Sequence, residues 1–139
     1  MQHMLLNLNN IQLKILSKLI FKKYYLRYLS KELNLIPSTV MRNLNILVDN
    51  KLIDSFVEGK NKYFFLPKNY SSIHTIKLAE QYRTLQFIKK HTSLLPILED
   101  ITKLSNNIII FSSYAKGTQN DKSNLDILII GKKRKFKHN

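Results

Sequence analysis

The sequence predicts an α+β fold, and three observations support this class. The N-terminal half carries helical patterns followed by two short β-rich runs, the middle carries one long helical pattern, and the C-terminal part has two apolar strand-like runs. With 139 residues, of which 44% are hydrophobic, the chain can bury a core in one domain or in two small units. We expect three parts, over residues 1–68, 69–91 and 92–139, with the boundary after Pro67 marked by turn and helix-cap residues.

The first helix is predicted over residues 9–22, where Ile11, Ile15 and Leu19 recur at helical spacing. Residues 24–27 are expected to form a short extended segment. This helix supplies the first apolar side of the N-terminal core.

Two more helices are predicted around a tight turn. Ser30 is expected to cap a short helix, and residues 34–36 form the turn that follows it. Pro37 then opens the next helix, which runs to about residue 50, because proline is favoured at the first helical position.

The helix after Pro37 has one apolar and one polar side. Its apolar residues fall within a narrow arc at about 100° per residue, and they are Val40, Leu44 and Leu47. Ser38, Arg42 and Asn45 lie opposite, on a face available to a DNA major groove. Arginine pairs bidentately with guanine and asparagine with adenine. A solvated face of an ordinary helix would look the same in isolation.

A hairpin is predicted next. Residues 55–57 and 63–66 are β-branched or aromatic runs on either side of the polar loop 58–62, and Pro67 ends the second strand. Lys60 and Lys62 are expected at the tip, within reach of DNA phosphates. Helix, turn, helix and hairpin in this order indicate a winged helix-turn-helix.

The chain is strongly basic. It has 23 Lys and Arg against 9 Asp and Glu, a formal net charge of +14, and an isoelectric point near 10.0. This balance favours a polyanionic partner, with double-stranded DNA as the first candidate. The alternative is a basic surface that serves only solubility. A membrane partner is disfavoured, because the charges are spread along the chain and not confined to one amphipathic helix.

Several site classes are not expected. Cysteine is absent, and the four histidines are scattered without ligand spacing, so we expect no disulfide, metal site or cofactor. No apolar run reaches the roughly 18 to 20 residues of a membrane span, and no signal peptide is recognisable. A cytoplasmic protein is therefore expected.

Residues 29–66, and most clearly 37–44 followed by 47–53, resemble the winged-helix regulators of the MarR and ArsR type. The resemblance implies a homodimer that binds operator DNA. Asn50 stands where such proteins often have glycine at the helix end, and asparagine tolerates the left-handed conformation needed there. The candidate DNA-binding residues are Ser38, Thr39, Arg42, Asn43, Asn45, Lys60, Asn61 and Lys62.

A long helix is predicted over residues 72–90. In winged-helix regulators a helix in this place commonly builds the dimer interface, and packing on its own chain is the open alternative. A further helix is expected over residues 94–104, with Pro96 in its first turn.

In the last third, a strand over residues 108–111 runs into Ser112 and Ser113, and a second strand over 123–130 carries Asn124 and Asp126. This arrangement resembles the start of the nucleotidyltransferase fold of the polymerase-beta superfamily. That superfamily has Gly-Ser after the first strand and a carboxylate pair on the second, which holds two divalent ions. The chain would then combine a winged helix with a small α/β half-fold.

Three departures from that superfamily argue against enzyme activity. Asn124 replaces the first carboxylate of the pair, Ser112 replaces the glycine, and no third carboxylate follows Ile130. We therefore interpret the segment as degenerate, with a role in packing, dimerisation or binding of a protein partner. The residues of the vestigial nucleotide site would be Ser112, Ser113, Lys116, Asn124 and Asp126.

The leading hypothesis is a sequence-specific, dimeric transcriptional regulator that binds duplex DNA. One alternative is a nucleotidyltransferase-related protein that docks through its winged helix, either as a residual enzyme or as an antitoxin-like module that binds a partner. The other is a module whose winged helix contacts protein. The basic tail 132–137 would add sequence-independent DNA affinity.

Overall fold

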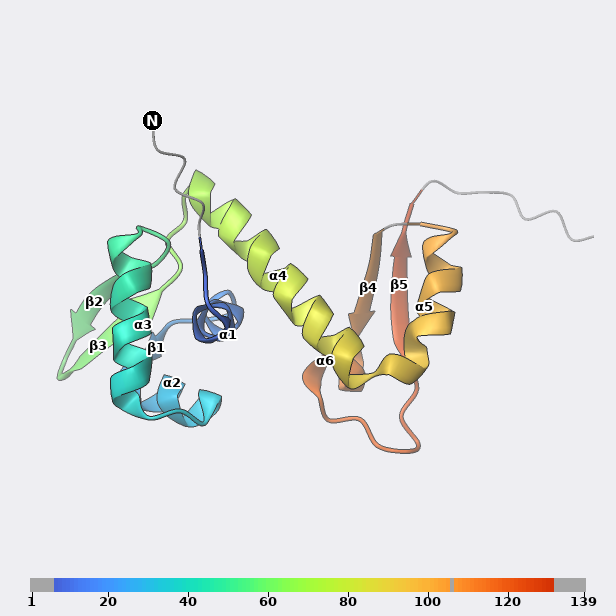
Figure 1. Cartoon of the computed structure of the whole chain (residues 1–139), viewed down its shortest axis with the longest axis horizontal. Helices are drawn as coiled ribbons and strands as arrows, with labels where there is room; N and C mark the ends of the chain where they lie inside the picture. Colours follow the sequence, from blue (N-terminus) through green and yellow to red (C-terminus); the bar gives the residue numbers. More distant parts are fainter. Residues whose placement is uncertain (1–6, 106, 132–139) are drawn as a thin grey trace, which may run out of the picture. The chain divides into compact units, whose positions relative to one another are not determined.

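The structure is a computed structural model that describes residues 7–105 and 107–131 (Figure 1). The chain divides into two compact units, Met1–Leu85 and Gln86–Asn139. The division falls within the long helix α4, Tyr70–Lys90. Among the residues described, no helix combines the length and apolar character needed to cross a membrane.

The N-terminal unit contains three helices, a three-stranded sheet and the first part of α4. The sheet is antiparallel with strand order β1-β3-β2. Its elements before α4 are α1 (Asn10–Leu19), β1 (Tyr24–Tyr25), α2 (Leu26–Leu33), α3 (Pro37–Asp49), β2 (Asp54–Glu58) and β3 (Asn61–Phe65).

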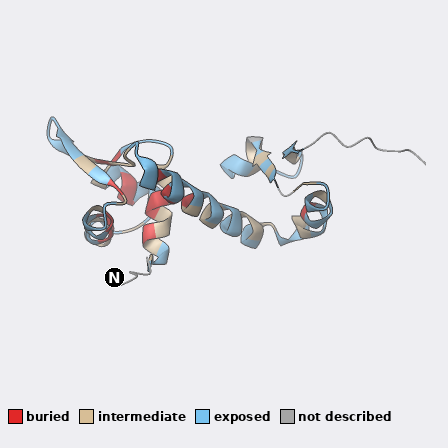
Figure 2. Cartoon of the chain, turned by 90° about the horizontal axis from the view of Figure 1, so that it is seen from above, coloured by how far each residue is buried: buried red, intermediate tan, exposed pale blue. Residues whose placement is uncertain are grey.

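One apolar core holds this unit together. Figure 2 shows the buried residues gathered mainly in the N-terminal unit. The side chains predicted for the inner arc of α3 are fully buried there, and Phe64 of β3 packs with them from the sheet. Ala79 of α4 belongs to the same core, so the predicted long helix packs on its own chain in this part.

Helix α1 begins at a capping box and ends earlier than predicted. The Asn9 Oδ1 accepts from the Gln12 N–H at 2.8 Å, and the Gln12 Oε1 accepts from the Asn9 N–H at 3.0 Å. The helix stops at Leu19, because the chain must turn to bring Tyr24 beside Phe64 in the sheet.

The expectation that Ser30 caps a helix is wrong. Helix α2 begins four residues earlier, at Leu26, and Ser30 lies inside it. The Ser30 hydroxyl donates to the Leu26 carbonyl at 2.8 Å, which satisfies a buried polar group within the helix. The extended segment is correspondingly limited to Tyr24 and Tyr25.

The turn between α2 and α3 was predicted at the right place. Asn34 adopts the left-handed conformation with φ 54°, and the Leu35 N–H donates to the Ser30 carbonyl at 3.0 Å. Pro37 opens α3 as expected. At its other end the left-handed residue is Lys51, with φ 58°, and not Asn50.

The hairpin has a two-residue turn, Gly59 and Lys60. Gly59 carries the positive φ of +61° that a tight turn between twisted strands requires. The predicted five-residue loop was too long, because Glu58 and Asn61 already pair with each other as strand residues. Lys62 therefore lies on β3 opposite Val57.

The C-terminal unit contains the end of α4, short helices and a two-stranded antiparallel sheet. Its described elements after α4 are the 3-10 turn η1 (Thr92–Leu94), α5 (Leu95–Thr102), β4 (Asn107–Phe111), α6 (Ser112–Lys116) and β5 (Asp126–Ile130). Strand β5 begins three residues later than predicted, so Asn124 lies outside it. Leu98 is the one hydrophobic side chain of this unit that is buried among the residues described.

Candidate nucleic-acid interface

Helix α3 presents the polar face predicted from its sequence. Ser38, Arg42 and Asn45 are exposed, while Thr39 is half-buried. The opposite side of α3 is anchored in the core, so the exposed face stands on a rigid support. An exposed arginine and asparagine one turn apart, on a firmly packed helix, are the groups that hydrogen-bond to base edges in a major groove.

Asn43 does not share that face. It is only 6% exposed, and its amide is engaged within the protein. The Asn43 Oδ1 accepts from the Asn9 side chain at 3.0 Å, and its Nδ2 donates to the Thr39 carbonyl at 2.9 Å. Asn43 thus joins α3 to the start of α1, which corrects its place among the candidate DNA-binding residues.

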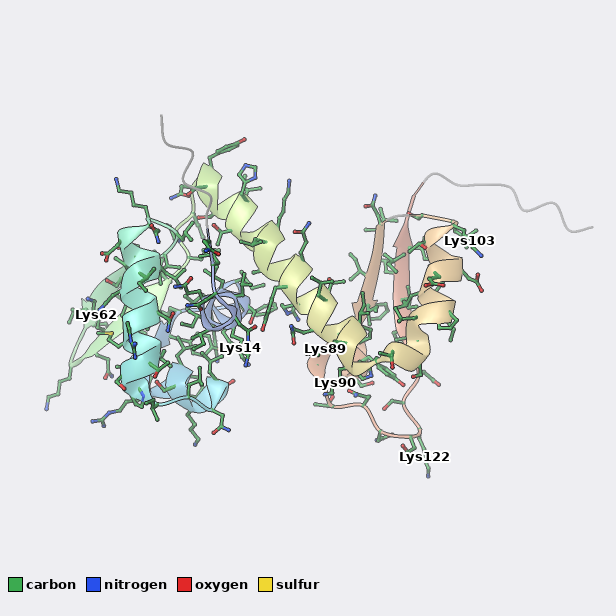
Figure 3. All side chains as sticks on the ribbon, viewed as in Figure 1. Lys14, Lys62, Lys89, Lys90, Lys103 and Lys122 are labelled. Atoms are coloured by element: carbon green, nitrogen blue, oxygen red, sulfur yellow. The ribbon has the colours of Figure 1, made fainter. Side chains whose placement is uncertain are left out.

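The hairpin carries its basic residues on the exposed surface. Lys60, Asn61 and Lys62 are all exposed, and Lys62 is labelled in Figure 3. The Lys62 Nζ is 5.6 Å from the centre of the Phe64 ring, a cation–π contact that leaves the charge at the surface. The one acidic residue of this tip, Glu58, accepts from the Lys23 Nζ at 2.8 Å.

The salt bridges among the described residues involve basic residues outside the candidate interface. Within residues 7–105 and 107–131, no salt bridge involves Arg42, Lys60 or Lys62, whereas four other basic residues are paired. These three cations are accordingly available for phosphate or base contacts.

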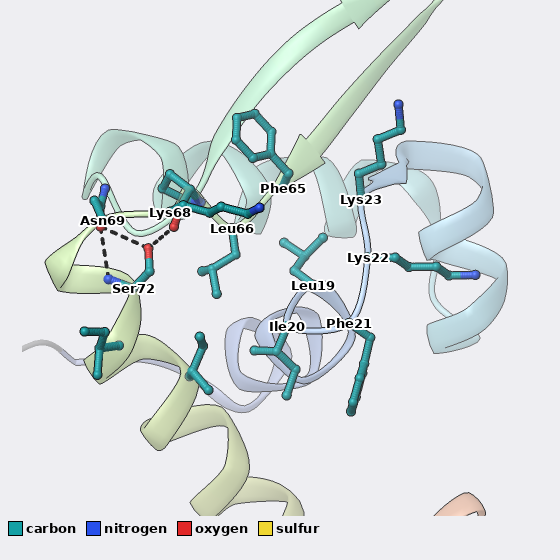
Figure 4. Close-up of a pocket in the computed structure, with 13 residues that line it drawn as sticks. Leu19, Ile20, Phe21, Lys22, Lys23, Phe65, Leu66, Lys68, Asn69 and Ser72 are labelled. Carbon is teal, nitrogen blue, oxygen red and sulfur yellow. Dashed lines mark hydrogen bonds between the residues drawn. The ribbon is translucent and has the colours of Figure 1, made fainter.

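A pocket of about 590 Å³ lies in the N-terminal unit, between the end of α1, the end of β3 and the start of α4 (Figure 4). Its lining residues were not predicted as a site from the sequence. Its walls are mainly apolar, with Ile20, Phe65 and Ile73 among them, and three lysines border it, namely Lys22, Lys23 and Lys68. The sequence signal that could have indicated it is the run of basic and aromatic residues that follows α1, Phe21-Lys22-Lys23-Tyr24-Tyr25.

Tyr82 of α4 contacts α1 at one polar point. Its hydroxyl donates to the Asn10 Oδ1 at 2.9 Å. Burial raises the pKa of the Tyr82 hydroxyl above its ordinary value of 10.0, because the phenolate would lose solvation. The hydroxyl is therefore neutral, and able to donate, at physiological pH.

The candidate residues of the C-terminal unit lie near one end of its small sheet. Phe111 pairs with Asp126, so α6, which carries Ser113 and Lys116, starts beside Asp126. Asn124 is exposed outside the strand, so the two side chains at 124 and 126 do not form the strand pair that metal binding would use. Among the described residues, no group of three His, Asp or Glu side chains is placed to hold a metal ion.

No protein-family model and no curated protein matches this sequence. Solved structures are similar in fold. The zinc-responsive MarR family member ZitR from Lactococcus lactis is 20% identical with a TM-score of 0.53, and the match covers 70% of this chain and 65% of ZitR. The transcriptional repressor BigR from Xylella fastidiosa is 12% identical with a TM-score of 0.51, and the match covers 55% of this chain and 76% of BigR. The chain thus shares the winged-helix fold of these regulators, and neither match indicates a nucleotidyltransferase-like segment.

Proposed function

We propose that this protein is a transcriptional regulator that binds duplex DNA as a homodimer through its winged helix. The exposed polar face of α3 carries the proposal, because Arg42 and Asn45 lie side by side on a helix whose opposite side is buried in the core. The shared fold with two regulators and the net charge of +14 support it.

Each part of the interface has its own role in this proposal. Arg42 and Asn45 contact base edges, while Ser38 and Thr39, in the first turn of α3, contact nearby base edges or phosphates. The hairpin acts as the wing, and Lys60, Asn61 and Lys62 contact the DNA backbone on that side. Asn43 is left out, since its side chain is buried.

The dimer is proposed to form through α4. This helix buries Thr75 and Ala79 against its own unit and leaves large apolar side chains exposed elsewhere. Ile73 and Leu85 are 49% and 63% exposed, respectively, and a second copy would cover such groups. For residues 92–139 we propose a role in assembly or in binding a protein partner, and no transfer chemistry.

Selection of bound sequences from a random duplex pool at fixed salt tests the DNA proposal. Arg42→Ala is expected to relax base preference by roughly 1 to 3 kcal/mol at one position, because it removes a base-edge contact. Lys60→Ala is expected to weaken binding to all duplexes alike, because it removes a phosphate contact. It should also lower the slope of log affinity against log salt concentration by about one. Unchanged selectivity in Arg42→Ala would refute specific readout by α3.

The dimer is tested separately, by measuring the mass of the free protein and of the DNA complex in solution. A dimer is expected for wild type, and Leu85→Glu, which places a charge on the proposed α4 surface, is expected to shift it toward monomer. A monomer of wild type on DNA would overturn this part alone.

A further inference from the structure

The sheet of the N-terminal unit has an aromatic outer face. Strand pairing places Tyr25 opposite Tyr63, and Tyr63 opposite Phe56, so one ring from each strand lies across the sheet. The Tyr25 and Tyr63 ring centres are 5.7 Å apart, as are those of Tyr63 and Phe56. Phe65 extends the series, 5.6 Å from Phe56. These four residues are called the aromatic row.

The aromatic row is not part of the core. Phe64, the neighbour of Tyr63 and Phe65 on the same strand, points to the helices and is 1% exposed. Because side chains alternate along a strand, Tyr63 and Phe65 point to the other side. Phe56 is 38% exposed and the other three rings are half-buried, so aromatic surface remains accessible to solvent.

Positive charge borders this surface. The Lys23 Nζ lies 4.6 Å from the Tyr63 ring centre and 4.9 Å from that of Phe56. At the far end, Phe65 also lines the pocket bordered by Lys22, Lys23 and Lys68 (Figure 4). Two carboxylates occur nearby, those of Asp54 and Glu58. The aromatic row thus crosses the three strands, and at Phe65 it reaches a pocket with a basic rim.

We propose that the aromatic row binds single-stranded nucleic acid by stacking unpaired bases on its rings. Accessible rings beside lysines are the recognition elements of single-strand binding surfaces, in which the rings stack on bases and the cations contact phosphates. A duplex cannot stack its bases on these rings, because its base faces are already stacked on one another. The site goes beyond the proposed operator binding, which uses the exposed face of α3.

Lys23 and Glu58 regulate access to these rings in this proposal. Their ion pair joins side chains that are 46% and 61% exposed, and such exposed pairs are weak. A phosphate of the bound nucleic acid can therefore replace Glu58 as the partner of Lys23. The lysine side chain then moves away from the rings of Tyr63 and Phe56 and contacts that phosphate. Glu58 opposes binding in two ways, by its charge and by holding Lys23 over the rings.

Fluorescence anisotropy with labelled oligothymidine, and with a labelled duplex as a second probe, tests the proposal on the full chain. Phe56→Leu keeps an apolar side chain but removes the aromatic face, and it is expected to weaken oligothymidine binding roughly five- to hundredfold. Duplex affinity is expected to stay unchanged. Phe56→Tyr, which restores a ring, is expected to bind oligothymidine as wild type does.

Variants of exposed charged residues test the proposal independently, because they change oligothymidine binding without altering a buried side chain. Glu58→Gln is expected to tighten oligothymidine binding several-fold, since it frees Lys23 and removes a negative charge. Lys23→Gln is expected to lower the slope of log affinity against log salt by about 0.7, the value for one contact with a single strand. Lys89→Gln removes the same charge from α4 and is the matched control, with a smaller expected change.

Three outcomes would overturn the proposal. The first is oligothymidine affinity that is equal in Phe56→Leu and wild type. The second is an equal loss on duplex and single strand in Phe56→Leu, which would assign the rings to the fold or to the duplex interface. The third is a shift from dimer to monomer in Phe56→Leu, which would make the aromatic row a contact between copies. If Phe56→Leu fails to fold, as judged by circular dichroism, unchanged or weaker binding by Glu58→Gln overturns the proposal instead.

Discussion

Asn43 and Asn45 lie two positions apart on α3 and have opposite surroundings. Asn43 accepts and donates hydrogen bonds inside the protein, whereas Asn45 is exposed. Asn43→Ala leaves the Asn9 side chain without its acceptor, so we expect the free energy of unfolding to fall by about 1 to 3 kcal/mol. Urea denaturation measures it. Asn45→Ala is the matched control and should stay within about 0.5 kcal/mol; equal losses in the two variants would contradict the assigned roles.

These two asparagines also show how far single residues can be predicted from the sequence. Helical periodicity alone placed Ser38, Arg42 and Asn45 outside and Leu44 inside, since the angle between positions is set by the helix itself. The burial of Asn43 depends on Asn9, which is 34 positions away in the sequence. A contact of that kind depends on how α1 packs on α3, and this packing cannot be predicted from the residues around Asn43 alone.

The turn of the hairpin depends on Gly59. Its φ of +61° lies in the region that side chains disfavour, although no atom lies within 4 Å of where a Cβ would be placed. Gly59→Ala should therefore lower the free energy of unfolding by about 1 to 2 kcal/mol through backbone strain alone. Thermal or urea denaturation measures this. Gly59→Asn should cost less, because asparagine tolerates positive φ, and an equal cost for both variants would argue against strain as the cause.

The contact between α1 and α4 should depend on pH through Tyr82. The pKa of Tyr82 is raised in the folded state, so its contribution to stability is fully present below the unfolded value of 10.0 and is lost as the pH rises through the folded value. Urea denaturation from neutral to strongly alkaline pH should show a loss of stability in wild type that is smaller in Tyr82→Phe. Parallel curves for the two proteins would contradict this.

The positions of helices and turns were predicted best where they depend on the backbone preference of single residues. Pro37 and the turn at Asn34 located α3 correctly, because proline and the left-handed asparagine act through their own backbone conformations. The start of α2 was missed, because Tyr24 and Tyr25 pair with β3 and the helix begins directly after them. The aromatic row was missed for the same reason, since its rings meet only through the register of three strands.

The two units differ in how much apolar surface they bury. The N-terminal unit has a core of fully buried side chains from helices and sheet, whereas the C-terminal unit has only Leu98 buried among its described hydrophobic residues. Both strands of the β4–β5 pair leave large side chains exposed, with Phe111 at 48% and Leu128 at 50%. A two-stranded sheet with this little cover is marginally stable in water.

Amide hydrogen exchange on the whole chain should reflect this difference. Helices α1 and α3 pack in the core, so their amides should exchange slowly, through global unfolding. The amides of β4 and β5 should exchange faster, through local opening. If the C-terminal unit assembles with another copy, protection of β4 and β5 should rise with protein concentration while that of α1 and α3 changes little, because binding stabilises only the elements that it covers. Protection of β4 equal to that of α3 at low concentration would mean that this unit is stable without a partner, and its role in assembly would lose its physical basis.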